Sequence, residues 1–281
     1  MMNNILQQIA ANAAASIPEE PEDYTVAGLL YCGKCRTPKE TAFMVMGKPM
    51  TVRCLCQCGK EAADQERAER KRQERAIQLD RMRSVGMTDR TQRESTFAND
   101  DGRNVAMTEF CRNWCNCWPE MYRNNIGLIF LGGVGTGKSF LAACIANEVM
   151  DRYLADVMMT NFSRVLNGLF SAQDKNGYIE DLVRYPLLII DDFGIERASE
   201  YAMEQVYSVI DARARTKRPL IVTTNLELED LKNPKDMAHR RIYSRLLSMC
   251  TPTDFGEGDS REDMAKQKLE QLKQILRERN T

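Results

Sequence analysis

Apolar runs of strand length recur through the last two thirds of the chain. From about Thr96 onward they alternate with stretches in which apolar residues recur every three or four positions. The first pattern is typical of buried strands and the second of amphipathic helices. Their alternation predicts an α/β domain in which helices flank a parallel sheet. The predicted strands are residues 126–131, 155–160, 186–191, 219–224 and 248–253.

The same pattern divides the chain into four segments. Residues 1–25 indicate a short helix followed by a Pro/Glu-rich linker, and residues 26–60 hold half of the cysteines in a turn-rich module. Residues 61–95 carry charges of both signs at three- and four-residue spacing, which is typical of a solvated helical linker. Residues 96–281 form the α/β domain, and an amphipathic helix over 262–279 closes it.

Composition narrows the classes of partner and compartment. The chain has 281 residues and a net charge of −1, so a nucleic acid would have to bind a local basic patch. The N-terminus lacks the basic region of a signal peptide, and no apolar run reaches the length of a membrane span. We therefore expect no membrane association and a cytoplasmic location. Thiols stay reduced there, so clustered cysteines are first interpreted as metal ligands.

A glycine-rich segment between the first predicted strand and a helix carries the clearest chemistry. It reads GGVGTGKS, a complete phosphate-binding loop, and the residues that follow it have a helical pattern. Glycines let the backbone approach the phosphates, and the helix N-terminus favours negative charge. The segment therefore predicts binding of a nucleoside triphosphate. Its predicted binding residues are Gly132, Gly133, Val134, Gly135, Thr136, Gly137, Lys138, Ser139 and Phe140.

Polar residues end two later strands. Asp191 and Asp192 follow the apolar run 187–190, and Asn225 follows the run 219–224. We expect Ser139 and Asp191 to hold Mg²⁺, Asp192 to orient the attacking water and Asn225 to contact that water or the γ-phosphate. Lys138, Asp191, Asp192 and Asn225 are thus candidate catalytic residues.

Arginines in the C-terminal part supply two further candidates. A basic helix over residues 237–247 contains Arg245, which is suited to reach a neighbouring subunit's nucleotide. Arg261 is a candidate second contact to the nucleotide within the same chain. The alternative for the helix arginines Arg240 and Arg245 is a solvated face.

Residues 96–281 resemble the AAA+ ATPases of the DnaC/DnaI replicative helicase loaders and their relatives, the IstB-like transposition helpers. The motifs that carry the resemblance are GGVGTGKS, LLIIDD, TTN and RIYSRL, at residues 132–139, 187–192, 223–225 and 241–246. The segment STFANDD at 95–101 is similar to loaders of phages and Gram-positive bacteria, in which Phe97 would lie near the adenine. The resemblance implies self-assembly, contact with single-stranded DNA and a hexameric helicase as partner. It departs from the family at Asp192, where Glu is usual, which favours slow hydrolysis.

The N-terminal cysteines have the spacing of a zinc ribbon. Cys32 and Cys35 form one C-x-x-C turn, and a second turn about nineteen residues on contains Cys54, Cys56 and Cys58. Four of these five thiols would hold a structural Zn²⁺. The spacing makes Cys58 the firmest ligand of the second turn and does not separate Cys54 from Cys56. The loader resemblance implies that such a module engages the helicase.

The remaining candidates have structural interpretations or weak signals. Cys111, Trp114, Cys115 and Trp118 share one helical face and indicate core packing, as do Cys144 and Cys250. His239 is expected on the polar surface. Residues 161–184 are the favoured region for single-stranded DNA. Individual basic candidates for DNA contact are Arg164, Lys175, Arg213, Arg215, Lys217 and Arg218.

The motifs predict an ATPase that uses ATP, Mg²⁺ and Zn²⁺, and the resemblance implies that it is an ATP-dependent helicase loader. Two alternatives remain at this point. One is a transposition helper ATPase that binds duplex DNA, and the other is an ATP-switched adaptor with negligible turnover, which Asp192 favours.

Overall fold

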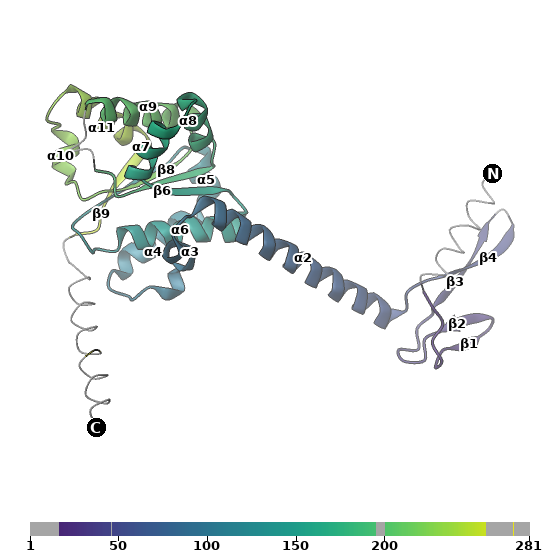
Figure 1. Ribbon diagram of the computed structural model, residues 1–281. Helices are drawn as coiled ribbons and strands as arrows, with labels where there is room; N and C mark the ends of the chain where they lie inside the picture. The colour runs from purple at the N-terminus through teal and green to yellow at the C-terminus, as the bar shows by residue number, and fades with distance from the viewer. Residues whose placement is uncertain (1–16, 46, 195–199, 257–271, 273–281) are drawn as a thin grey trace. The chain divides into compact units, whose positions relative to one another are not determined.

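The computed structural model describes residues 17–45, 47–194, 200–256 and 272. It consists of two compact units, divided between Ile77 and Gln78 (Figure 1). Most of the predicted N-terminal helix and nearly all of the predicted C-terminal helix lie outside the described residues. No described helix combines the length and apolar character that crossing a membrane requires.

Two antiparallel hairpins make up most of the described part of the N-terminal unit. β1 (Tyr24–Val26) pairs with β2 (Leu29–Tyr31), and β3 (Glu40–Val45) pairs with β4 (Lys48–Arg53). The turn between β1 and β2 has positive φ at both central residues, 50° and 81°, which matches the twist of the strands. Helix α2 (Gln57–Gly86) begins in this unit and continues past its boundary.

The core of the N-terminal unit is small and partly ionic. Its buried apolar side chains among the described residues are Leu30, Cys32 and Cys56. Lys39 and Asp23 form an ion pair at 2.5 Å, with side chains that are 5% and 1% exposed. So small an apolar core gives the N-terminal unit little stability. A structural metal would therefore contribute much of its folding free energy.

A five-stranded parallel sheet organises the C-terminal unit. Its strands are β5 (Gly127–Leu131), β6 (Val157–Asn161), β7 (Leu187–Asp191), β8 (Leu220–Thr223) and β9 (Cys250–Asp254). Their order across the sheet is β6-β7-β8-β5-β9, with every pairing parallel. The prediction of a parallel sheet flanked by helices is confirmed, and β8 lies between the strands that carry the phosphate loop and the two aspartates.

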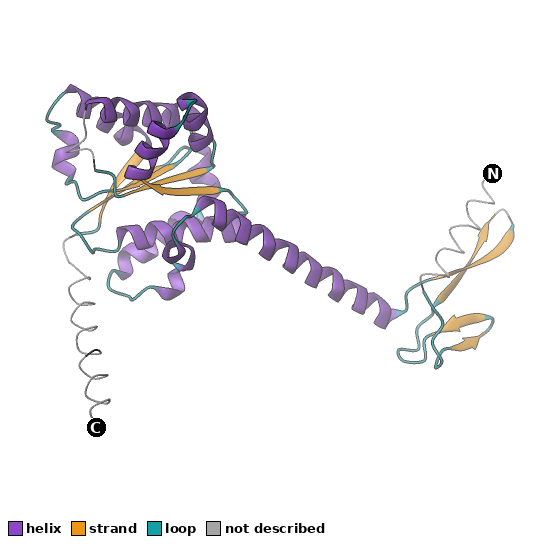
Figure 2. Cartoon of the chain, viewed as in Figure 1, coloured by secondary structure: helices purple, strands orange, loops and turns teal. Residues whose placement is uncertain are grey.

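Helices cover both faces of this sheet (Figures 1 and 2). One face is covered by α3 (Arg90–Glu94), α4 (Val105–Asn116), α5 (Trp118–Arg123) and α6 (Lys138–Tyr153), together with the end of α2. The other is covered by α7 (Phe162–Ser171), α8 (Lys175–Val183), α9 (Glu200–Thr216) and α11 (Met237–Met249). The short helices η1 (Phe97–Asn99) and α10 (Leu228–Lys232) complete the unit. Each face has its own hydrophobic cluster, so the strands are buried on both sides.

Four cysteines of this unit lie in the core as predicted, whereas two other predictions need correction. Cys111, Cys115, Cys144 and Cys250 are at most 4% exposed, and burial raises the pKa of Cys111 to about 12. His239 is 7% exposed rather than a surface residue, because its ring packs 5.8 Å from that of Tyr243 and Nδ1 lies 2.9 Å from Asp236.

Arg213 is the second correction, because it is fully buried and cannot contact DNA. Its guanidinium donates to the backbone carbonyls of Val183, Tyr185, Pro186 and Pro219. These carbonyls lie just before β7 and β8, so one arginine satisfies backbone acceptors where two neighbouring strands begin.

Candidate nucleotide-binding and metal sites

The phosphate loop connects β5 to α6 and is closed around Lys138. This ammonium is 7% exposed and donates to the carbonyls of Gly132 and Gly133 at 2.7 and 2.6 Å. It also donates to Oδ1 of Asn225 at 3.0 Å. A Cβ at Gly132, where φ is 132°, would lie 2.8 Å from the carbonyl of Gly256. Only glycine fits that position without displacing the backbone.

The first turn of α6 offers backbone donors to an anion. Gly137 caps the helix with a φ of 91° and no side-chain hydrogen bond, and the first turn contains no acidic residue. The N-cap glycine thus offers no side-chain acceptor to the N–H groups of the first turn, which lie at the positive end of the helix. The Ser139 side chain is exposed beside them, where its predicted role as a Mg²⁺ ligand requires it to be.

The two aspartates at the end of β7 share a hydrogen-bond partner on β8. Thr223 donates from its hydroxyl to Oδ1 of Asp191 at 2.5 Å, and the same hydroxyl accepts from the backbone N–H of Asp192 at 2.9 Å. Asp192 adopts a φ of 52°, a left-handed conformation that Asp tolerates better than Glu. Asp191 is half-buried and Asp192 is exposed, which suits a metal ligand and a group that orients water.

A pocket of about 540 Å³ adjoins the loop on the β9 side. Gly132, Gly133 and Asn225 line it together with Asp254 and Gly256. The strand order explains the convergence, because β8 has β5 on one side and β7 on the other. Lys138, Asn225, Thr223 and Asp191 therefore meet at the carboxyl edge of the sheet, where parallel α/β sheets bind ligands.

Arg245 lies on α11, held against α9. Its Nη2 is 3.1 Å from Oδ1 of Asp211, and the side chain remains about half exposed. Asp211 also pairs with Arg215. One turn earlier on both helices, the guanidinium of Arg241 lies 4.3 Å from the ring centroid of Tyr207. Two contacts at matching positions thus fix the directions of Arg241 and Arg245.

Two predicted nucleotide contacts differ in their placement. Phe97 is 6% exposed, and the guanidinium of Arg112 covers its ring at 5.0 Å while donating to its carbonyl. Little of the ring is open to a base, and its adenine contact stays a prediction. Arg261 lies outside the described residues.

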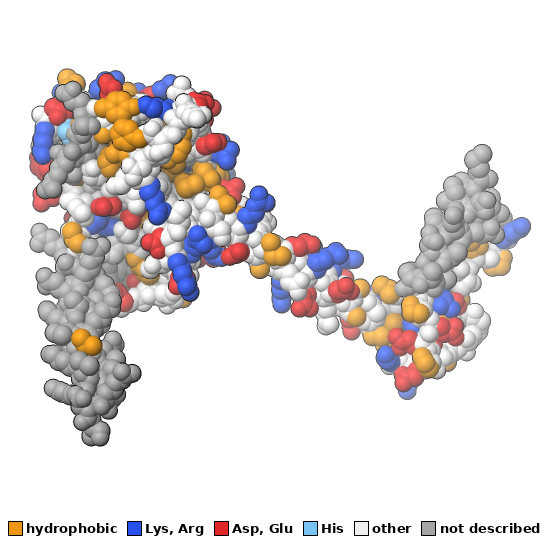
Figure 3. All heavy atoms as spheres, viewed as in Figure 1, with side chains coloured by type: hydrophobic (Ala, Val, Ile, Leu, Met, Phe, Trp, Pro, Cys, Tyr) orange, Lys and Arg blue, Asp and Glu red, His pale blue; other side chains and the backbone are white. Residues whose placement is uncertain are grey.

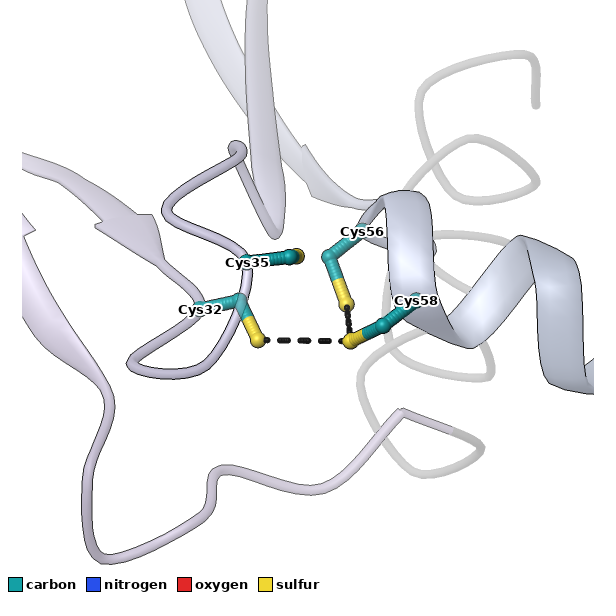
Figure 4. A group of neighbouring side chains, drawn as sticks. All are labelled: Cys32, Cys35, Cys56 and Cys58. Carbon is teal, nitrogen blue, oxygen red and sulfur yellow. Dashed lines mark hydrogen bonds between the residues drawn. The ribbon is translucent and has the colours of Figure 1, made fainter.

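Four N-terminal thiols converge on one point (Figure 4). The sulfur atoms of Cys32, Cys35, Cys56 and Cys58 all lie within 4.8 Å of one another. Tetrahedral zinc with Zn–S bonds of about 2.3 Å would require separations of about 3.8 Å. The measured separations include 3.6 Å between Cys32 and Cys58 and 3.3 Å between Cys56 and Cys58. The donor set and its size fit zinc.

Of the two cysteines that the spacing leaves open, the structure brings Cys56 rather than Cys54 to the other three thiols. The Cys56 sulfur faces the other three from the turn that begins α2. Cys54 directly follows β4 and directs its sulfur to the hydroxyl of Thr41 at 3.6 Å and the carbonyl of Pro38 at 3.7 Å. Gly33 in the first turn has no room for a side chain, since a Cβ would lie 2.1 Å from the carbonyl of Glu22.

Paired substitutions test this assignment. We expect Cys56→Ser to lose zinc and to unfold the N-terminal unit, because one of four thiolates is removed. Cys54→Ser should keep one zinc per chain, because its sulfur makes only weak hydrogen bonds. Zinc content after gel filtration, measured by atomic absorption, distinguishes the two. Equal loss from both variants would contradict the assignment of Cys56.

The comparisons with known proteins agree with this geometry. Residues 60–256 match the model of the family described as IstB-like ATP binding protein, which is well over half of the chain. The chain belongs to the IstB-like ATP-binding family. Its C-terminal unit also has the fold of a solved protein, a putative primosome component from Streptococcus pyogenes serotype M3, with a TM-score of 0.50 and 21% identity over 59% of this chain and 88% of that one.

Curated relatives of the IstB-like chain include two helicase loaders. It is 32% identical over 122 residues to the replicative helicase loader DnaC of Escherichia coli strain K12, which covers 41% of this chain and 49% of DnaC. It is 24% identical over 173 residues to the replicative helicase loader DnaI of Bacillus subtilis strain 168, covering 57% and 55%. The chain thus spans about half the length of the curated relatives it matches.

The sequence did not reveal two residues that position the candidate catalytic side chains, Thr223 and Asp211. Thr223 belongs to the TTN motif, but its bond to Asp191 depends on β8 pairing with β7, which follows from sheet order rather than motif order. Asp211 contacts Arg245 from a different helix. A signal was present for Asp211, since an acid four residues before Arg215 in a helix is placed to form an ion pair with it.

Proposed function

We propose that this IstB-like chain is an ATP-dependent loader of a hexameric replicative helicase onto single-stranded DNA. Two sets of hydrogen bonds at one edge of the sheet carry the proposal. Lys138 donates to Asn225. The hydroxyl of Thr223 donates to Asp191 and accepts from the N–H of Asp192. These contacts link the phosphate loop to the end of β8, and the end of β8 to the two aspartates at the end of β7, as an ATP-driven switch requires. Such a loader would act in the cytoplasm.

Each residue of the proposed cycle has a defined task. Lys138 and the first turn of α6 would bind the phosphates of ATP, and Mg²⁺ held by Ser139 and Asp191 would neutralise their charge. Asp192 would orient water, and Asn225 would exchange its bond to Lys138 for one to the γ-phosphate or the water. Arg245 of an adjacent copy would stabilise the charge that develops. Binding and hydrolysis would thereby alter the contact between neighbouring subunits.

The N-terminal unit is proposed to bind the helicase. Several apolar side chains on its hairpins are exposed, including Tyr24, Val26, Phe43 and Met44, at 40% to 67%. A zinc-stabilised unit can display such side chains without a large core of its own. The two helicase-loader relatives supply the partner class for this proposal.

An exposed aromatic pair with a lysine supports the contact with single-stranded DNA. Phe170 and Tyr201 are 55% and 42% exposed and stack with centroids 5.5 Å apart. Lys175 hydrogen-bonds the Tyr201 hydroxyl and lies 5.1 Å from the ring. Hydrophobic and basic side chains gather over α7–α9 in Figure 3. Phe170 and Lys175 lie within the 161–184 region favoured by the sequence, whereas Tyr201 lies on α9.

Alanine substitution of these two aromatics tests the DNA contact. Each base–aromatic stack contributes about 1–3 kcal/mol, so Phe170→Ala and Tyr201→Ala should each weaken binding of oligo-dT about 5- to 150-fold. Phe110→Ala, at an equally exposed aromatic on α4, is the matched control and should leave affinity unchanged. Fluorescence anisotropy measures both. Unchanged affinity in the two test variants would remove α7–α9 from the DNA surface.

The function as a whole is tested by ATP turnover in the presence of its proposed partners. Phosphate release is measured with and without oligo-dT and a hexameric replicative helicase, while light scattering follows complex formation. A stable complex with altered turnover supports the loader. Turnover with duplex DNA bound and no helicase complex would instead indicate the transposition helper. Helicase binding that needs ATP but produces no turnover would indicate the adaptor, which Asp192 in place of the usual Glu favours.

A further inference from the structure

A second pocket of the C-terminal unit lies where the strands begin, at the edge opposite the phosphate loop. It has a volume of about 530 Å³ and is lined by the end of α2 and by residues that lead into β6, β7 and β8. Asp156 precedes β6, Pro186 precedes β7 and Arg218 lies two residues before β8. The nucleotide site uses the other ends of these strands, so this pocket takes no part in it.

The lining of the pocket is strongly basic. Arg81, Arg184 and Arg218 line it, and Asp156 is the one acidic residue among its lining side chains. Arg184 pairs with Asp181, which is exposed and outside the lining. Within the described part of the chain, Arg81 and Arg218 have no carboxylate within ion-pair distance. Their guanidinium groups are therefore available to a ligand.

A fourth arginine adds a positive charge behind the wall of the pocket. Arg213 donates to the carbonyls of Tyr185 and Pro186, and both of these residues line the pocket. Among the described residues its hydrogen-bond acceptors are all backbone carbonyls, no carboxylate pairs with it, and its Nε has no partner. Burial, and secondarily repulsion from Arg218, lower the pKa of Arg213 to about 9. An unneutralised buried cation is costly, and an anion in the pocket would offset that cost.

The type of anion follows from the donors. Guanidinium groups bind phosphate oxygens bidentately and do so better than a point charge such as an ammonium. Tyr185 is half-buried in the same lining, with Arg184 5.8 Å from its ring centroid, and offers a π-face next to the charges. Phosphate contacts beside a ring suit a nucleotide chain.

We propose that the pocket formed by Arg81, Arg184, Tyr185 and Arg218 binds the phosphodiester backbone of a single nucleic-acid strand. This contact goes beyond the proposed function, since it lies at the opposite edge of the sheet from the ATP site and on elements other than the Phe170–Tyr201 pair. A strand that engages both surfaces would be held at two places on one subunit.

The salt dependence of strand binding tests the pocket. Each phosphate contact to a single strand contributes about 0.7 to the slope of log affinity against log salt concentration, so loss of three arginines should reduce the slope by about 2. The test variant is Arg81→Gln/Arg184→Gln/Arg218→Gln, and the probe is fluorescent oligo-dT. The control Arg67→Gln/Arg70→Gln/Arg90→Gln removes equal charge from exposed arginines that each pair with an acid.

Two further measurements keep the outcome unambiguous. The variant Arg81→Lys/Arg184→Lys/Arg218→Lys retains the charge and should keep most of the salt slope. Unchanged ATP affinity in every variant shows that the C-terminal unit is folded. An unchanged slope in the glutamine variant, or an equal fall in the control, would overturn the proposal. So would inhibition by inorganic pyrophosphate that depends on the three arginines without any change in the strand slope, because the site would then take a small phosphate. A reduced slope in the glutamine variant with normal helicase loading would support the pocket without testing the loader. An unchanged slope with lost helicase loading would overturn the pocket and leave the proposed function standing.

Discussion

Lys138→Ala should lower the affinity for ATP about 100-fold, because charge-assisted hydrogen bonds to phosphate contribute about 1.5–3 kcal/mol. The substitution also leaves the Gly132 and Gly133 carbonyls and the Asn225 side chain without the donor that now binds them. Both effects act at the loop and leave the sheet intact. Isothermal titration with a non-hydrolysable ATP analogue measures the affinity directly.

A lysine outside the site provides the control for this prediction. Lys217 is exposed and has a positive φ of 51°, so Lys217→Asn removes the charge at a position that Asn tolerates well. It should bind ATP normally. If Lys138→Ala retains native affinity, then the phosphate loop is not where ATP binds, and the proposed function loses its basis.

Arg245→Ala should reduce ATP turnover by about 10³-fold or more while leaving ATP affinity nearly unchanged, since an arginine supplied in trans acts in the transition state. Asp192→Asn should be equally slow for a different reason, because it removes the carboxylate but keeps a residue that tolerates the left-handed backbone at φ 52°. The Arg245→Ala subunit keeps Asp192, and the Asp192→Asn subunit keeps Arg245. An equal mixture should therefore regain activity, because roughly a quarter of the head-to-tail interfaces then combine an intact Asp192 with an intact Arg245.

The same mixing experiment reveals the task of Asp211. Because its carboxylate holds Arg245 at 3.1 Å, Asp211→Asn removes the charge that fixes the guanidinium and should slow turnover about 5- to 10-fold. Addition of Asp192→Asn subunits, which contribute a correctly held Arg245, should restore part of this loss. A defect in Asp211→Asn that no partner subunit relieves would indicate a merely structural ion pair. If Arg245→Ala also fails to complement, the nucleotide site is not shared between subunits.

The sequence predicted those features that depend on local pattern. Apolar runs separated by helical stretches located all five strands of the sheet, and the spacing around Lys138 located a loop whose geometry requires Gly132. Buried cysteines at helical spacing, such as Cys111 and Cys115, were recognised from periodicity alone. Each of these signals lies within about twenty consecutive residues, so no knowledge of the tertiary arrangement was needed.

Features that depend on strand order or helix packing could not be predicted. Thr223 contacts Asp191 because β8 pairs with β7, and Asp211 contacts Arg245 because α9 packs on α11. Arg213 had the appearance of a surface residue beside Arg215 and Arg218, yet the carbonyls that surround it come from two separate segments. The choice between Cys54 and Cys56 likewise depended on where α2 begins.

The contact between Lys138 and Asn225 has a consequence for the energetics of the ATP cycle. In the structure the ammonium already has three oxygen acceptors at 3.0 Å or less. Incoming phosphate therefore replaces existing bonds rather than filling an unmet demand, and the affinity for ATP is the difference between two satisfied states. Release of the nucleotide after hydrolysis then costs less free energy, because Lys138 regains these acceptors. The Asn225 side chain then responds to nucleotide binding, because its hydrogen bond from Lys138 breaks when the triphosphate binds.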